Sequence, residues 1–254
     1  NEGAAWYTAA NEARAADLRA GKSNLHPVER RNLARIGPLS EWCNRAVHLQ
    51  CASGYDTLSL LLEGAREVVG VDISEMHIEN ARWTSARVGL PARWFCCDVL
   101  ETPHDLDGTA DLVYTGRGAI YWLHDLNGWA QVVARLLRPG GVLSLLEDHP
   151  VTWLFSQDTP TLTLSGNAYF THAEWNKGWP DSYIGALETP AEQQTPKHER
   201  LWTLADVFGA LTGAGLVVAH LGEHPDEYWE AFPKLSAEEK AKLPMTFSMV
   251  ARKP

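Results

Sequence analysis

Short apolar runs alternate with amphipathic segments over residues 45–147. The runs have the length of buried strands, and the segments between them carry apolar residues at helical spacing. We expect strands near residues 45–50, 67–71, 92–97, 110–115 and 141–147, and helices near 55–64, 75–88 and 125–138. This alternation predicts a mostly parallel sheet with helices on both faces.

Further elements flank this alternation. Ahead of it, residues 5–20 and 27–36 are expected to be helical, the second helix between His26-Pro27 and Gly37-Pro38. After a long interruption the pattern resumes with one helix and two strands, over Leu204–Thr212, Leu216–His220 and Thr246–Ala251. A chain of 254 residues that is 45% apolar can bury one large α/β core.

The turn after the first strand reads Val47-His48-Leu49-Gln50-Cys51-Ala52-Ser53-Gly54. A strand buried on both faces ends here in small residues, which let backbone amides face a ligand. The next apolar run ends in Asp72, whose carboxylate can accept two hydrogen bonds from a ribose diol. Helix capping is the alternative role for Asp72, since a helical pattern follows Ser74-Glu75. The pattern predicts a nucleotide-binding βαβ unit.

This turn resembles the first motif of the class I S-adenosylmethionine-dependent methyltransferases. Within them it is similar to a bacterial group of small-molecule enzymes with a His-Leu-Gln-Cys-x-x-Gly-x-Asp-Thr-Leu-Ser turn, which the chain matches from His48 through Ser59. It departs from the commoner Gly-x-Gly-x-Gly turn, because Gln50 and Ala52 occupy the places of two glycines. A diphosphate needs close backbone approach at several glycines, so the departure argues against a dinucleotide-binding dehydrogenase.

Three later segments extend the resemblance. The strand expected over Arg93–Val99 carries Asp98 near its end, and the resemblance implies that this carboxylate bonds the adenine amine. Ala110–Gly118 combines a strand with the loop at which the family's cofactor and substrate sites adjoin. Leu136–Glu147 holds a helix end, a Pro-Gly-Gly turn and a strand, a combination common in these enzymes.

The resemblance implies a fold, a cofactor and the residues that bind it. The fold is α/β, a Rossmann-like doubly wound seven-stranded sheet whose last strand is antiparallel. We expect a single methyltransferase domain over 1–254, with a helical cap (1–40), a cofactor-binding core (41–150), a substrate-lid insertion (151–200) and the end of the sheet (201–254). The cofactor is S-adenosylmethionine, and the expected binding residues are Gln50, Cys51, Gly54, Asp72, Ile73, Asp98, Val99, Thr115 and Gly116.

Residues 151–200 are rich in aromatic side chains, and so long a connection is more often functional than slack. The aromatics either close one end of the sheet as a satellite core or roof a substrate pocket. Two short antiparallel strands are expected around Thr161–Leu164 and Tyr169–His172. Expected substrate-binding residues, inside the insertion and beyond it, are Tyr7, Arg117, Trp122, Tyr169, Trp175 and Trp202. The guanidinium of Arg117 could bind a substrate carboxylate or stabilise the loop that contains it.

Methyl transfer from a sulfonium is an in-line displacement, so positioning supplies much of the catalysis. An amine acceptor needs little more, whereas a phenol, an alcohol or a carbon acid gains from a general base. His149 follows the fifth strand and His124 follows the fourth-strand loop, and both lie where ligands bind parallel sheets. We expect O-methylation with His149 or His124 as the base. N-methylation, C-methylation and a purely structural role for either histidine are the alternatives.

Two other functions remain open on the sequence. A nicotinamide-dependent oxidoreductase shares the βαβ unit but needs Gly-x-Gly-x-x-Gly, which this turn lacks. A catalytically inactive S-adenosylmethionine-binding regulator would keep the cofactor site without a base.

Charge and composition narrow the partners. A formal charge of −10 and the lack of any Lys or Arg run disfavour nucleic acid. No apolar run approaches the roughly 20 residues of a membrane span, and residues 1–20 do not resemble a signal peptide. The four cysteines lack Cys-x-x-Cys spacing, which disfavours zinc or disulfides. We expect a metal-free cytoplasmic enzyme that acts on a small molecule, with natural-product biosynthesis as its setting; the oligomeric state is open.

Overall fold

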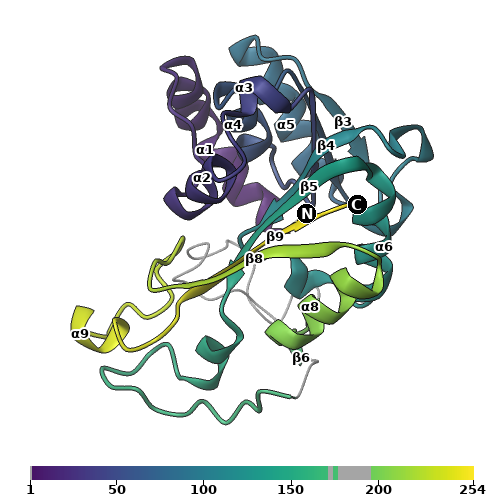
Figure 1. The fold of residues 1–254 in the computed structure, drawn as a ribbon. Helices are drawn as coiled ribbons and strands as arrows, with labels where there is room; N and C mark the ends of the chain where they lie inside the picture. Colours follow the sequence, from purple (N-terminus) through teal and green to yellow (C-terminus); the bar gives the residue numbers. More distant parts are fainter. Residues whose placement is uncertain (1, 171–173, 177–195) are drawn as a thin grey trace.

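The computed structural model describes residues 2–170, 174–176 and 196–254 (Figure 1). Its centre is a seven-stranded sheet of order β3-β2-β1-β4-β5-β9-β8. The strands are β1 (Arg45–Leu49), β2 (Glu67–Asp72), β3 (Arg93–Cys96), β4 (Ala110–Gly116), β5 (Leu137–Asp148), β8 (Val217–His224) and β9 (Thr246–Arg252). The first five pair in parallel, and β9 inserts antiparallel between β5 and β8. The predicted fold class is confirmed.

The helices follow the expected order, with several short additions. They are α1 (Glu2–Arg19), α2 (Pro27–Ala34), α3 (Leu39–Trp42), α4 (Tyr55–Leu62), α5 (Glu75–Val88), α6 (Leu126–Leu136), α8 (Leu204–Gly213) and α9 (Ala237–Lys240). Single 3₁₀ turns are η1 (Val99–Glu101), η2 (His104–Leu106), η3 (Ile120–Trp122) and η4 (Pro150–Leu154). No described helix is long and apolar enough to cross a membrane.

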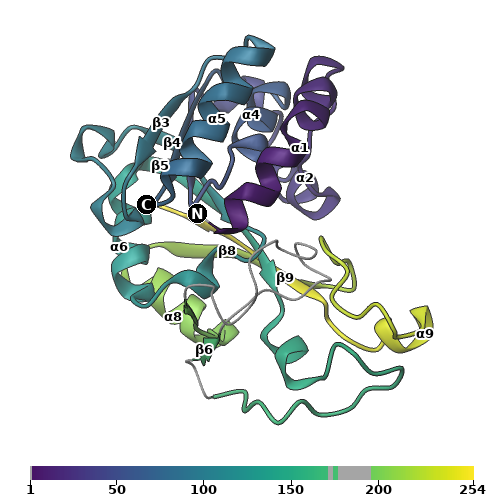
Figure 2. The same cartoon turned by 180° about the vertical axis from the view of Figure 1, so that it is seen from behind.

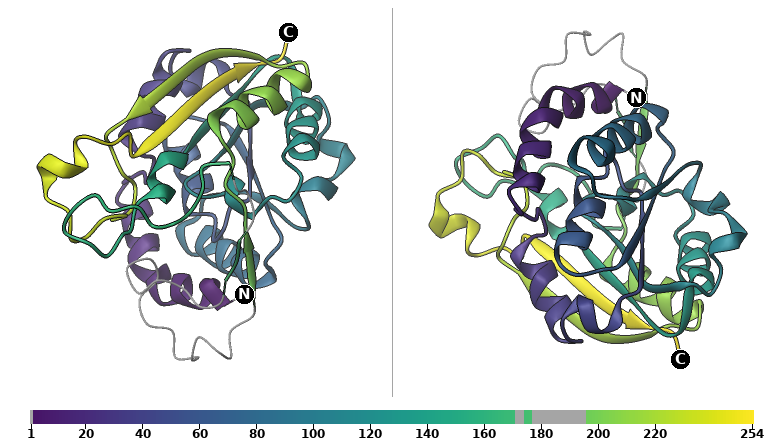
Figure 3. Two further views of the ribbon diagram at one scale, coloured as in Figure 1. Left: turned by 90° about the horizontal axis from the view of Figure 1, so that it is seen from below. Right: turned by 90° about the horizontal axis from the view of Figure 1, so that it is seen from above.

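Each face of the sheet has its own apolar core, because successive strand residues point to opposite sides. One face joins α6 and α8 to the strands through Val47, Leu49, Val69, Val71, Trp129, Val133, Val207 and Leu211. The other packs on α2, α3 and α4 through Ala46, Val68, Leu112, Leu33, Leu39 and Leu60. Figure 3 shows the helices α1, α4 and α5 on the opposite side of the sheet from α6 and α8. With both faces covered, β1 is buried from Ala46 to Leu49, as its largely apolar sequence predicts.

Helix α1 is attached to α5 by a polar contact that is largely buried. The Asn80 side chain on α5 accepts hydrogen bonds from Thr8 (3.2 Å) and Asn11 (3.0 Å) and donates to the Ala4 carbonyl (3.3 Å). Burial makes loss of these bonds costly, so Asn80 fixes the cap helix over the first βαβ unit.

The insertion after β5 differs from the expectation. In place of a strand over Thr161–Leu164, Leu164 makes a single antiparallel bridge with Phe155. Tyr169 and Phe170 lie in a turn, and the rest of the second expected strand lies outside the described residues. The short strands that do pair are β6 (Glu174–Asn176) and β7 (Lys197–Glu199). Local propensity cannot specify which of several short extended segments find a partner.

A satellite core lies at one end of the sheet, where the loop after η4 meets the segment that carries α9 (Figures 1 and 2). Phe155 and Leu162 from the insertion pack there against Ala231, Phe232, Leu235, Leu243 and Met245. Of the two roles expected for the insertion, its described part thus has the first, a satellite core that closes one end of the sheet.

Candidate functional site

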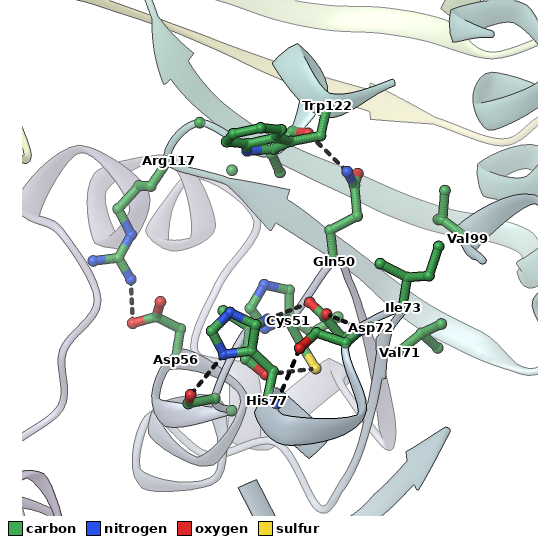
Figure 4. A pocket seen from close by; sticks show the side chains of 18 of the residues that line it. Gln50, Cys51, Asp56, Val71, Asp72, Ile73, His77, Val99, Arg117 and Trp122 are labelled. Carbon is green, nitrogen blue, oxygen red and sulfur yellow. Dashed lines mark hydrogen bonds and ion pairs between the residues drawn. The ribbon is translucent and has the colours of Figure 1, made fainter. Parts of the chain in front are cut away.

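A cavity of about 570 Å³ opens at the carboxyl ends of β1, β2 and β4. Its walls come from α1, the turn after β1, the ends of β2 and β3, the loop after β4, and residues 228–229. Figure 4 shows the Gln50 side chain directed toward Trp122, with Asp56 and Arg117 facing each other on one side. Ligand cavities in parallel α/β sheets form at this edge.

The turn after β1 keeps a glycine-like backbone without the usual glycines. Gln50 has φ 57° and Ala52 has φ 45°, both in the left-handed region, while Gly54 has φ 74°. Left-handed backbone costs an L-residue roughly 1–2 kcal/mol, so strain is concentrated at this functional turn. Gly54 is required for another reason: a Cβ there would lie 2.4 Å from a Trp94 ring carbon.

Gln50 spans the cavity between two loops. Its amide nitrogen donates to the Ala119 carbonyl (2.7 Å) in the loop after β4. Its Oε1 is buried and finds no hydrogen-bond partner among the described residues. A buried acceptor without a donor is costly, so this oxygen fits a donor group of a bound ligand.

Asp72 is held rigidly at the end of β2. Its two oxygens accept hydrogen bonds from the Ala52 amide (2.7 Å) and the Ser74 amide (2.9 Å). Ser74, and not Asp72, is the N-cap of α5. Each carboxylate oxygen keeps a second lone pair, so Asp72 can still accept from a diol. The neighbouring Ile73 is 70% exposed, an apolar surface at the edge of the cavity.

Asp98 follows β3 in a similar arrangement. It caps η1 by accepting from the Leu100 amide (2.8 Å), and Val99 and Leu100 line the cavity beside it. Of the nine expected cofactor residues, eight line the cavity: Gln50, Cys51, Gly54, Asp72, Ile73, Asp98, Val99 and Gly116. Thr115 does not, because it lies within β4 and is fully buried.

Arg117 is engaged by two carboxylates. Its guanidinium pairs with Asp56 and lies 3.5 Å from the Glu29 carboxylate, which also accepts from the Tyr114 hydroxyl (2.5 Å). Burial alone would lower the pKa of Arg117, but Asp56, Tyr114 and Glu29 raise it well above its usual value. The guanidinium therefore braces the loop after β4 against α2 and α4, the second of the two roles expected for it.

A neutral histidine that the sequence reasoning missed lies beneath this pair. His48 points from β1 into the cavity wall, where its Nδ1 shares a hydrogen bond with the Thr57 hydroxyl (2.8 Å). Burial lowers the pKa of His48 to about 4, so the ring is neutral near pH 7. Its place inside a buried strand, two residues before the turn, is the sequence signal that could have found it.

The structure separates the expected substrate residues. Tyr7 and Trp122 line the cavity, together with Arg117. Trp202 lies in the core and donates to the Ile120 carbonyl (3.1 Å), while Tyr169 packs edge-on against Phe170, away from the cavity walls. Nothing is described for the Trp175 side chain. Whether an aromatic side chain of the insertion or of the segment before α8 reaches the cavity or the core depends on long-range packing. The aromatic content of a segment does not reveal this.

Tyr228 and Trp229 supply the aromatic wall that was expected from the insertion. None of the described residues 151–170 lines the cavity. The pair follows β8 in His224-Pro225-Asp226-Glu227-Tyr228-Trp229. Two adjacent aromatics in a proline-containing turn were the available signal. Arg14 and His77 are further lining residues that the sequence reasoning did not single out.

His149 is not placed to act as the expected base. Its Nδ1 accepts from the Val151 amide (3.2 Å), its Nε2 pairs with Glu223 (2.9 Å), and it does not line the cavity. Burial lowers its pKa, with Glu223 opposing. The expectation for His149 is corrected: the chain turns away from the cavity at η4, which His149 caps. His124 does line the cavity and is exposed.

The last two residues of β5 point in opposite directions. Glu147 accepts hydrogen bonds from the amides of Gly118 (2.7 Å), Ala119 (3.1 Å) and Ile120 (3.2 Å), and so fixes the loop after β4. Asp148 accepts from the Trp229 indole nitrogen, at 3.1 Å to each oxygen. Burial raises the pKa of Glu147 to about 8 and that of Asp148 to about 7.

The described residues contain no group of three or more His, Cys, Asp or Glu side chains that could hold a metal ion. All four cysteines are free thiols.

Known proteins resemble parts of this chain in sequence and most of it in fold. Residues 46–141 match a family model described as a methyltransferase domain. A biotin biosynthesis bifunctional protein of Bordetella avium is 34% identical over 103 residues, 40% of this chain and 21% of that protein. The chain's match thus spans about a fifth of that relative's length.

Two solved structures extend the likeness to most of the chain. A Listeria monocytogenes protein assigned as an S-adenosylmethionine-dependent methyltransferase has a TM-score of 0.65 at 14% identity, covering 89% of this chain and 98% of its own. An S-adenosylmethionine-dependent methyltransferase from Mesorhizobium loti has a TM-score of 0.63 at 20% identity, covering 89% and 96%. The expected family, enzyme class and cofactor agree with these matches. Residues 46–141 match the methyltransferase-domain family, and the chain has the fold of the class I S-adenosylmethionine-dependent methyltransferases.

Proposed function

We propose that this chain catalyses S-adenosylmethionine-dependent methyl transfer to a small-molecule acceptor. The observation that carries the proposal is the turn after β1, where Gln50 and Ala52 hold a strained, glycine-like backbone beside Asp72. Such strain persists where the surrounding structure and function require it. The turn faces one cavity, which also contains the Gln50 oxygen that lacks a partner in the described part of the chain.

The cavity walls have the groups that this cofactor needs. Asp72 would accept from the ribose diol and Asp98 from the adenine amine, while Ile73 supplies apolar surface for the base. The Gln50 Oε1 would accept from the ammonium of the methionine part. When bound, the cofactor supplies an electrophilic methyl group and needs no phosphate-binding glycines, which fits the turn.

A small acceptor suits the remaining space. A cavity of about 570 Å³ is in the usual range for ligand sites, which is roughly 300–1,000 Å³, and cofactor and acceptor would share it. The aromatic side chains Tyr7, Trp122, Tyr228 and Trp229 favour an aromatic or polyfunctional metabolite of the kind found in natural-product biosynthesis. We favour an oxygen acceptor, with nitrogen and carbon acceptors as alternatives. The cytoplasmic location and the exclusion of nucleic acid remain predictions.

Calorimetry tests the cofactor part and separates it from a nicotinamide-dependent oxidoreductase. We expect S-adenosylhomocysteine and S-adenosylmethionine to bind, and NAD not to bind. Asp72→Asn should weaken S-adenosylhomocysteine about 10-fold to 100-fold, because hydrogen bonds to a charged group contribute roughly 1.5–3 kcal/mol. Asp105→Asn is the matched control, since this exposed carboxylate pairs with Arg93 outside the cavity. Binding of NAD alone would overturn the proposal.

Turnover separates an enzyme from a catalytically inactive cofactor-binding regulator. The protein would be incubated with methyl-labelled S-adenosylmethionine and with phenols, catechols, carboxylic acids, alcohols and amines, and methylated products detected by mass spectrometry. Label transfer to one acceptor class supports the enzyme. Cofactor binding without transfer to any class would favour the regulator.

A further inference from the structure

One polar group of the cavity wall is not among the residues proposed to bind the cofactor. The Tyr228 hydroxyl is buried and makes no well-aligned hydrogen bond among the described residues, although Tyr228 lines the cavity. The hydroxyl lies at the loop after β4, 3.8 Å from where a Cβ on Gly118 would stand. A hydroxyl has one donor and two acceptor lone pairs, so even when it is directed at the Asp148 carboxylate it can accept a hydrogen bond from a ligand group in the cavity.

A carboxyl group lies on the other side of this hydroxyl. Asp148 interacts with Tyr228 closely enough that each shifts the pKa of the other. Trp229 holds both Asp148 oxygens, and Tyr121 donates to the Asp148 backbone carbonyl (2.7 Å). The carboxyl group is therefore fixed behind the hydroxyl, and Asp148 does not itself line the cavity.

We propose that Tyr228 takes the acceptor's proton while passing its own proton to Asp148. This inference rests on the proposed methyl transfer and names oxygen acids, phenols above all, as the acceptor class. As the acceptor oxygen bonds the methyl carbon and the carbon–sulfur bond breaks, the acceptor's O–H proton moves to the Tyr228 oxygen. The Tyr228 proton moves to the Asp148 carboxylate and returns later to water. The products are a methyl ether or ester, a neutral thioether and a carboxylic acid at Asp148.

The surroundings of Asp148 suit a proton acceptor. Burial raises its pKa to about 7, Tyr228 and Trp229 oppose that rise, and Glu227 adds to it. The charged and titratable groups that face the pair are Glu147, Glu227, Tyr121 and, through its ion pair with Glu227, Lys240. A base whose pKa lies near the working pH is the most effective. Burial keeps Tyr228 neutral by raising its pKa well above the usual value, so the hydroxyl relays a proton and does not store charge.

Glu147 and His124 are the rival bases, and geometry weakens both. Glu147 is committed to three backbone amides. His124 lines the cavity but is exposed to water. A base in this position is not shielded from solvent, so it lacks the water-excluded surroundings that strengthen electrostatic interactions in an active site.

A titration that needs no acceptor tests the pair first. The protein, saturated with S-adenosylhomocysteine and labelled with carbon-13 at aspartate side-chain carboxyls, is followed by NMR from about pH 5 to about pH 9. We expect one aspartate to titrate near pH 7, to be missing in Asp148→Asn, and to titrate at higher pH in Tyr228→Phe. Tyr121→Phe is the matched control, because its hydroxyl donates to the Asp148 backbone carbonyl. Absence of a near-neutral titration, or no shift in Tyr228→Phe, overturns the relay.

Kinetics with the acceptor class found by product screening test the proton path. Tyr228→Phe and Asp148→Asn should each lower kcat about 100-fold, flatten the acidic limb of the pH profile near pH 7, and change KM little. Tyr121→Phe should keep that limb. An amine as the acceptor, or an acidic limb that disappears in His124→Gln and persists in Tyr228→Phe, would overturn the inference.

Binding separates this inference from the proposed function. Tyr228→Phe and Asp148→Asn should bind S-adenosylhomocysteine as tightly as the unmodified chain. If the unmodified chain does not bind it, the proposed function fails; if binding holds and the titration is absent, only the relay fails.

Discussion

Substituting Gly54→Ala tests whether the strained turn is held by the packing around it. A side chain at φ 74° costs roughly 1–2 kcal/mol. The new Cβ would lie 2.4 Å and 2.7 Å from two Trp94 ring carbons and 2.8 Å from the Ala81 Cβ, and such overpacking costs roughly 1–3 kcal/mol. Alanine restricts the unfolded chain and returns roughly 0.4–1 kcal/mol. The expected net loss of unfolding free energy is about 2–4 kcal/mol.

Urea denaturation of the ligand-free protein measures this loss by linear extrapolation. Ala52→Gly is the matched control in the same turn: its φ of 45° is one that glycine adopts freely, so stability should change by less than about 1 kcal/mol. Trp94→Leu is itself destabilising, but Gly54→Ala should cost about 1–2 kcal/mol less in that background, because leucine has no ring at this place. A loss below about 1 kcal/mol for Gly54→Ala, or an unchanged loss in the Trp94→Leu background, would refute the packing argument.

Two further predictions concern the end of β5. Because the pKa of Glu147 is about 8 in the folded chain and roughly 4.3 when unfolded, the folded state holds more protons between those values, and its stability falls as pH rises. Urea midpoints between about pH 5 and about pH 8 should therefore fall less steeply for Glu147→Gln than for the unmodified chain; equal slopes would contradict the assignment. His149→Gln should cost about 1 kcal/mol of stability through the weakened η4 cap and the Glu223 contact, with kcat unchanged within about twofold. A loss of kcat near 100-fold would restore His149 as a base.

Much of the fold could be predicted because its signals are local. Buried parallel strands are continuous apolar runs, and glycine or proline punctuates their ends, so five strands and the helices between them were expected within a few residues of their bounds. Strand β8 runs beyond its expected end at His220 to His224, because β9 pairs with it over the whole length. That extension follows from a partner distant in sequence, which no local pattern specifies.

The cofactor side of the site was also accessible from the sequence. Gln50, Asp72 and Asp98 stand at the ends of successive parallel strands, and chain order alone brings such ends to one edge of the sheet. The acceptor side was not accessible. Its wall includes Tyr228 and Trp229, which reach the cavity only because β9 inserts between β5 and β8 and returns the preceding segment to the end of β5.

The sequence by itself determined three features: the alternation of strands and helices, the departure from a dinucleotide-binding turn, and the carboxylates at the strand ends. Each of them depends on residues close together in the chain. Tertiary structure alone decided which side chains meet. A strand turns successive residues to opposite faces, so Glu147 holds the loop after β4 while Asp148 lies behind Tyr228, and the turn at η4 carries His149 to Glu223. Those directions depend on register and long-range pairing, which are set only when the sheet is complete.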